Sequence, residues 1–101
     1  MATYISLIKF TQQGITTIKD AASRLDSRKE TLKALGAELK AIYLTLGRYD
    51  IVAIVEAPND ETAAKAALMS ASDGNVTTET FRAFTEDEYR ALIAALATLH
   101  G

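Results

Sequence analysis

The chain has 101 residues, of which 49% are hydrophobic, a formal net charge of −2 and no cysteine. This length and composition predict one globular domain over residues 1–101, and the slightly acidic balance argues against a nucleic-acid partner, which usually requires a basic face. The absence of cysteine excludes disulfides and thiolate metal sites.

No segment has the features of an export signal or a membrane anchor. The N-terminus lacks a basic stretch followed by an apolar core, which a signal peptide would have. No apolar run approaches the roughly 20 residues that a membrane-spanning helix needs. We therefore expect a cytoplasmic protein with no membrane partner.

The first third of the chain predicts a strand and then helix. Residues 3–10 are rich in aromatic and β-branched side chains on both faces, which is typical of a central strand. Over residues 15–35 apolar side chains recur every three or four positions, the spacing of one helix face. Asp20 and Ser23 are both candidate N-caps, so the pattern leaves open one bent helix or two. Gly36 is expected to end the helix.

The middle of the chain predicts a hairpin. Residues 37–46 alternate as a second strand, residues 47–50 form a turn, and residues 51–57 form a third strand. This third strand is apolar on both faces, so it should lie centrally with layers above and below.

The last part of the chain predicts a helix, a strand and a terminal helix. Asn59 or Asp60 is expected to cap an alanine-rich helix over residues 62–72. Residues 76–84 are half polar and predict an edge strand. Thr85 with Glu88 three residues later forms a capping box. An apolar stripe follows on the terminal helix, made of Tyr89, Leu92, Ile93, Leu96 and Leu99.

The resulting order is β-α-β-β-α-β with an added C-terminal helix. It predicts an α+β fold, a ferredoxin-like sandwich with a four-stranded antiparallel sheet. We place the first and third strands side by side at the centre and parallel to each other. Both crossover helices should lie on one face, since such connections are nearly always right-handed.

The turn and the third strand, residues 46–57, also carry a family resemblance. They resemble the signature of the GYD domain family, named for a Gly-x-Tyr-Asp motif found here at Gly47, Tyr49 and Asp50. The similarity extends to residues 4–10 and 75–86. It implies a ferredoxin-like subunit that associates through its sheet, as in dimeric α+β barrels, and it supplies no catalytic residues.

The second face of the sheet is the main open question. Two helices cover one face, and a terminal helix of roughly four turns is too short to cover the other. An open apolar face is unusual in a soluble monomer. We therefore expect a homodimer with the sheets face to face and the terminal helices closing the rim, or a higher assembly of such dimers. The space between the sheets would suit a small apolar ligand.

Six side chains are candidate binding residues, and catalytic residues stay unknown. Each also has a purely structural interpretation. For Arg48, Tyr49 and Asp50 it is hydrogen bonding and packing within the predicted turn. If Ile5 lies level with Val52, Lys9 lies level with Glu56, which makes that carboxylate either a functional group with a shifted pKa or half of a salt bridge. The six candidates are Tyr43, Arg48, Tyr49, Asp50, Glu56 and Arg82.

Two functions remain open from the sequence. The first is a small homo-oligomeric binding or interaction protein that holds an apolar or aromatic metabolite between subunits. The alternative is a cofactor-free enzyme of the dimeric α+β barrel type, such as a monooxygenase or isomerase. We expect no cofactor and no metal, because the single histidine, His100, cannot build a zinc site alone.

Overall fold

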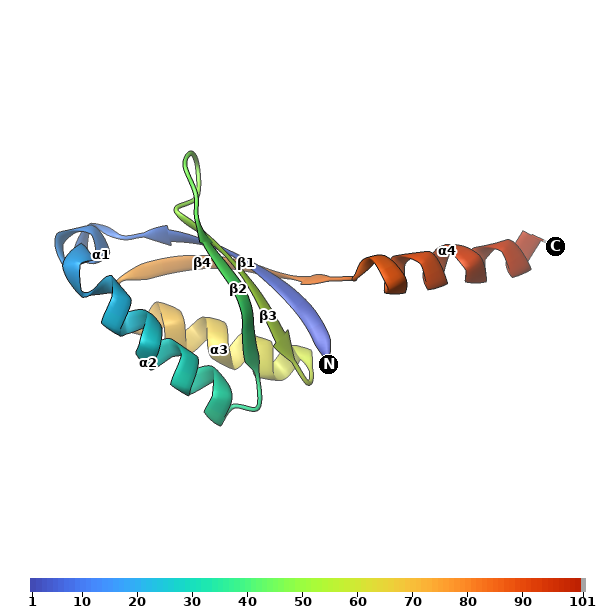
Figure 1. The fold of residues 1–101 in the computed structure, drawn as a ribbon, viewed down its shortest axis with the longest axis horizontal. Coiled ribbons are helices and arrows are strands. Elements are labelled where there is room, and N and C mark those ends of the chain that lie inside the picture. The colour runs from blue at the N-terminus through green and yellow to red at the C-terminus, as the bar shows by residue number, and fades with distance from the viewer. Residues whose placement is uncertain (101) are drawn as a thin grey trace.

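The computed structural model describes the backbone of residues 1–100 and the side chains of residues 1–99, so the side chain of His100 lies outside the described part. Its elements follow the expected order (Figure 1). The strands are β1 (Ala2–Phe10), β2 (Glu38–Leu44), β3 (Ile51–Ala57) and β4 (Val76–Ala83). The helices are α1 (Gln12–Thr16), the 3-10 turn η1 (Ile18–Asp20), α2 (Ala21–Ala34), α3 (Asp60–Ser72) and α4 (Glu86–His100).

The four strands form one sheet in the order β2-β3-β1-β4, with every neighbouring pair antiparallel. The antiparallel sheet and the central position of β1 and β3 are confirmed. Our expectation that these two strands run parallel is wrong. The crossover through α2 brings β2 back in the direction of β1, and the hairpin then reverses the chain, so β3 runs against both neighbours.

Helices α2 and α3 lie on the same face of the sheet, as the right-handed crossovers predict (Figure 1). The buried core between them is small. Three of its members are alanines, and the small side chains of Ala57 on β3 and Ala63 on α3 allow that helix to approach the sheet closely. The core consists of Tyr4, Leu32, Ala37, Ala57 and Ala63.

The helical region after β1 consists of two α-helices separated by a 3-10 turn, which settles the open alternative. Arg24 stabilises this break, because its guanidinium donates to the carbonyl oxygen of Thr17 at 2.9 Å and to the Thr17 hydroxyl at 3.1 Å. Asp20 occupies the N-cap position of α2 without a side-chain capping bond. Ser23 instead donates to the carbonyl oxygen of Asp20.

The two later helices begin as predicted. Asn59 is the N-cap of α3, and its side chain accepts from the amide of Thr62 at 2.9 Å. The capping box of α4 is present, since the Thr85 amide donates to Glu88 at 2.8 Å and the Glu88 amide donates to the Thr85 hydroxyl at 3.2 Å. Local sequence signals therefore fix both starts.

Helix α4 does not lie over the sheet. It extends away from the body of the subunit as a continuation of β4 (Figure 1), which gives the subunit principal extents of 58 × 31 × 18 Å. All the side chains of its apolar stripe are exposed. Among the described residues, no helix covers the second face of the sheet.

Candidate functional site

The face of the sheet opposite α2 and α3 is apolar, and we call it the open face. Side chains alternate along a strand, so residues next to the core positions Tyr4, Ala53 and Val55 point to this side. Most of them are half-buried by their neighbours alone. The apolar side chains of the open face are Ile5, Leu7, Ala41, Tyr43, Val52, Ile54 and Phe81.

The strand register arranges these side chains in two rows across the sheet. In the first row Ile5 lies between Ile54 and Phe81. In the second row Val52 lies between Leu7 and Tyr43. The two large aromatic rings lie on the outer strands and are the most exposed members, with Phe81 at 45% and Tyr43 at 61%. The two rows form one contiguous apolar surface.

A hydrogen bond between Tyr49 and Glu79 lies at the edge of the open face. Glu79 pairs with Leu7 across β1 and β4 and so points to this side. The Tyr49 hydroxyl donates to its carboxylate. This hydrogen bond to Glu79 raises the pKa of the Tyr49 phenol above its ordinary value, because the charged acceptor stabilises the protonated donor.

Glu56 is not paired with Lys9, and that expectation is wrong. In the antiparallel register Glu56 lies opposite Thr3 on one side and Glu38 on the other. Lys9 lies at the other end of β1, opposite Thr77. The expected pairing assumed parallel central strands, so the reversed direction of β3 accounts for the error.

Asp50 connects the hairpin to the end of β1. Its carboxylate accepts from the Phe10 amide at 2.9 Å, and its own amide donates to the Ile8 carbonyl oxygen at 2.9 Å. Its carbonyl oxygen accepts from the Thr45 amide at 2.8 Å, which closes the hairpin turn. Both backbone groups and the side chain of Asp50 are thus used in structural contacts.

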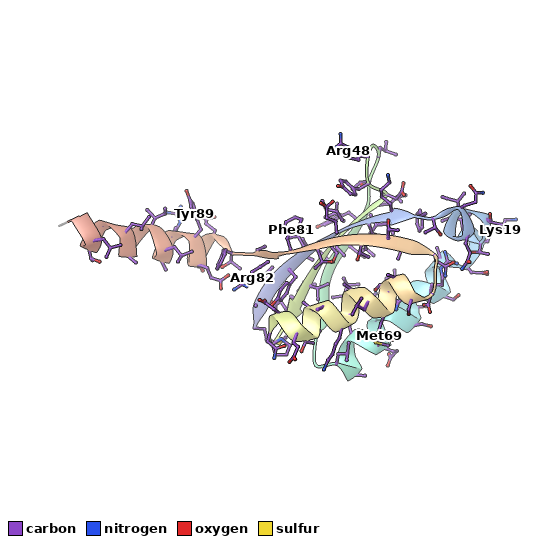
Figure 2. All side chains as sticks on the ribbon, turned by 180° about the vertical axis from the view of Figure 1, so that it is seen from behind. Lys19, Arg48, Met69, Phe81, Arg82 and Tyr89 are labelled. Carbon is purple, nitrogen blue, oxygen red and sulfur yellow. The ribbon has the colours of Figure 1, made fainter. Side chains whose placement is uncertain are left out.

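Arg82 lies on the helix-bearing side of β4, at the junction with α4, and Figure 2 shows it on the opposite side of the strand from Phe81. Its guanidinium lies 4.4 Å from the centre of the Phe84 ring and 5.9 Å from that of Tyr4. It also lies 3.7 Å from the Glu88 carboxylate. These contacts join β4, β1 and the first turn of α4.

Within one subunit the six candidate residues lie in different places. Tyr43 and Glu56 are on the open face, and Tyr49 is at its edge. Arg48 is exposed at the tip of the hairpin (Figure 2), while Asp50 and Arg82 make structural contacts at opposite ends of β1. No single pocket among the described residues gathers them.

The sequence interpretation did not identify Glu79 as the partner of Tyr49. Glu79 lies within residues 76–84, the predicted edge strand, and the alternation of that strand places it on the same side as Leu7 and Phe81. Among the side chains that the structure describes, no cluster of three His, Asp or Glu could hold a metal ion. No described helix is long and apolar enough to cross a membrane.

The fold and the open face define a class of protein. An antiparallel four-stranded sheet with two crossover helices on one face is a ferredoxin-like α+β subunit. The chain belongs to the GYD family, because the model of the GYD domain matches residues 4–93. The resemblance noted at Gly47, Tyr49 and Asp50 is thereby confirmed.

Two individual proteins are similar to this chain. One, from Thermus thermophilus, is named "Glutamine synthetase and cystathionine beta-lyase binding protein". It is 37% identical over 84 residues, which cover 82% of this chain and 88% of the relative. The other is the crystal structure of TTHA0845 from the same organism. It has a TM-score of 0.53 at 24% identity, covers 84% of this chain and 95% of its own, and supports the fold.

Proposed function

We propose that this chain is a homo-oligomeric protein-interaction module that works by binding rather than by catalysis. The observation that carries this proposal is the open face, a contiguous apolar surface with exposed Phe81 and Tyr43. Soluble proteins seldom leave such a surface uncovered. A two-fold contact between two such sheets would cover it, because a self-complementary surface closes a dimer.

The binding partner we propose is a metabolic enzyme. The relative from Thermus thermophilus is named for binding glutamine synthetase and cystathionine beta-lyase. By analogy, we propose that this chain binds an enzyme of one of these two kinds. The cytoplasmic location expected from the sequence stays a prediction.

A small apolar or aromatic metabolite between the two sheets remains part of the proposal. The exposed rings of Tyr43 and Phe81 supply apolar surface, and the Tyr49–Glu79 pair supplies a polar edge. Pockets of this composition are typical of ligand sites. The enzyme alternative has less support, because the six candidate side chains do not converge within one subunit.

Binding to the purified enzymes of the source organism tests this function. Immobilised protein is exposed separately to glutamine synthetase and to cystathionine beta-lyase, and binding is followed by biolayer interferometry. We expect saturable binding to at least one enzyme. An absence of binding to both, with the assembly intact, would contradict the proposed partner class.

A pair of variants tests the open face. Phe81→Asp places a charge on the open face, whereas Leu68→Asp places the same charge at an exposed leucine on α3. We expect the first variant to lose the sheet-to-sheet contact, seen as a smaller assembly, and the second to behave like the unmodified protein. Equal self-association of the two variants would contradict the proposal that copies of the chain meet through the open face.

A further inference from the structure

A second apolar region lies on the other side of the sheet, and we call it the α2 groove. It is a groove of about 490 Å³ between the start of α2 and the hairpin end of the sheet. Its lining is mainly aliphatic, and Leu44 at its margin is 78% exposed. Its lining includes Ile18, Ala22, Arg24, Leu25, Leu44 and Val76.

Helix α4 carries an exposed apolar stripe, the kind of surface that an apolar groove accommodates. Its large apolar residues lie along one face, and no charged residue occurs from Ala91 to Leu99. Leu92 and Leu96 are each about half exposed, at 51% and 50%. A helix with such a stripe is normally covered by another element.

The helix cannot reach the α2 groove of its own subunit. Val76 at the groove begins β4, and α4 follows the other end of that strand. An eight-residue strand spans about 26 Å, and α4 points away from it (Figure 1). The contacts of Arg82 with Phe84 and Glu88 hold this junction in the extended direction. Only the helix of another copy can enter the groove.

Charge also favours this pairing. The carboxylates of α4 all lie in its first turn, where Glu86 pairs with Arg90 at 2.7 Å and Glu88 lies 3.7 Å from Arg82, so the apolar segment from Ala91 to Leu99 brings no positive side chain toward the groove. Residues 12–34, which form one wall of the groove, carry five basic and three acidic side chains. Arg24 lines the groove and, among the described residues, donates only to uncharged oxygens of Thr17 and Gly14. The C-terminal half of α4, which bears the negative end of the helix dipole, suits this cation.

We propose that α4 of one copy docks through its apolar stripe into the α2 groove of a second copy. This inference deepens the proposed self-association and uses a surface different from the open face. Each copy then donates one helix and receives one. The contact joins two different surfaces, so it closes either as a reciprocal pair or as a ring.

Cysteine pairing provides a direct test, because the chain has no cysteine of its own. One preparation carries Leu96→Cys on the stripe, and another carries Leu44→Cys at the groove. Mixed and oxidised, they should form a disulfide-linked heterodimer in high yield. The matched control, Ala94→Cys with Leu44→Cys, places the thiol on the opposite side of α4 and should give little product. No linkage, or equal linkage in both mixtures, would overturn the proposal.

Complementation gives a second test that separates this contact from the open face. Leu96→Asp disables the stripe, and Leu44→Asp disables the groove, both at exposed positions. Each variant alone should lose the α4-dependent assembly. A mixture should regain it, because each partner supplies the surface that the other lacks.

The aspartate variants and the cysteine pair together distinguish the proposed contact from other contacts between copies. If Leu44→Asp assembles normally while Leu96→Asp does not, α4 docks elsewhere and the proposal is wrong. If Phe81→Asp abolishes dimers while the cysteine pair still links, the open face and the α2 groove are separate interfaces. If the cysteine pair fails while Phe81→Asp still disrupts a dimer, the proposed function survives and this inference does not.

Discussion

At the level of single residues, the Gly-x-Tyr-Asp motif mainly forms the hairpin turn and connects it to β1. Gly47 has a φ of 118°, a conformation that other residues rarely adopt. Asp50 joins the hairpin to β1 through both its backbone and its side chain. Tyr49 instead points toward Glu79 at the edge of the open face. The motif therefore positions the third strand and one polar group beside it.

Removal of the Asp50 carboxylate should destabilise the subunit. Asp50→Ala leaves the partly buried amide of Phe10 without its acceptor, which costs about 1–3 kcal/mol of unfolding free energy. Asp50→Asn retains an acceptor and should lose less. Urea denaturation of both variants measures the difference, and an equal loss would show that the amide bond is not the cause.

The Tyr49–Glu79 pair predicts a pH effect at the alkaline end. The pKa of Tyr49 is raised above 10.0, mainly by the hydrogen bond to Glu79. A raised pKa means that the stabilising contribution is present below the ordinary value and is lost as the pH rises through the folded value. In Glu79→Ala the phenol should titrate closer to its ordinary pKa, as followed by NMR of the Tyr49 ring carbon. An unchanged titration would contradict this assignment.

At the scale of elements, the junction between β4 and α4 holds the helix outward. Glu88 accepts from the Thr85 amide, and this bond lowers the pKa of the Glu88 carboxylate. Its stabilising contribution is therefore present above pH 4.5, the ordinary value, and is lost as the pH falls through the lowered one. Acidification should release the first turn of α4 while the sheet remains folded.

Loss of the N-terminal cap of α4 should destabilise the start of that helix and leave the stability of the sheet unchanged. Thr85→Ala removes the hydroxyl that accepts from the Glu88 amide, at a cost of about 1 kcal/mol for the helix start. Because α4 extends away from the body, amide exchange in its first turn should accelerate about fivefold without a comparable fall in the melting temperature of the sheet. A cooperative loss of the whole subunit would show that α4 packs on the body.

The sequence predicted most of the fold because its signals are local. The capping box at Thr85, the cap at Asn59 and the hairpin at residues 47–50 each depend on neighbouring residues only. The pairing of Lys9 with Glu56 was wrong because register depends on strand direction, which is a tertiary property. The α2 groove and the outward direction of α4 were not predicted, since neither follows from periodicity within one element.

At the scale of the whole molecule, one subunit presents two uncovered apolar surfaces on opposite sides of its sheet. The open face spans all four strands, with Phe81 and Tyr43 on its outer strands. The α2 groove is a hollow of about 490 Å³, and residues 12–34 beside it carry five basic and three acidic side chains. Each surface suits a different kind of contact, one between like faces and one between a helix and a groove.

Sedimentation equilibrium at micromolar concentration measures the number of chains in the assembly, with Phe81→Asp and Leu68→Asp measured in parallel. We predict a mass of two chains or a multiple of two for the unmodified protein and for Leu68→Asp. For Phe81→Asp we predict a decrease that reflects loss of the sheet-to-sheet contact. A single-chain mass for the unmodified protein would contradict the account, because both apolar surfaces would then remain open to solvent.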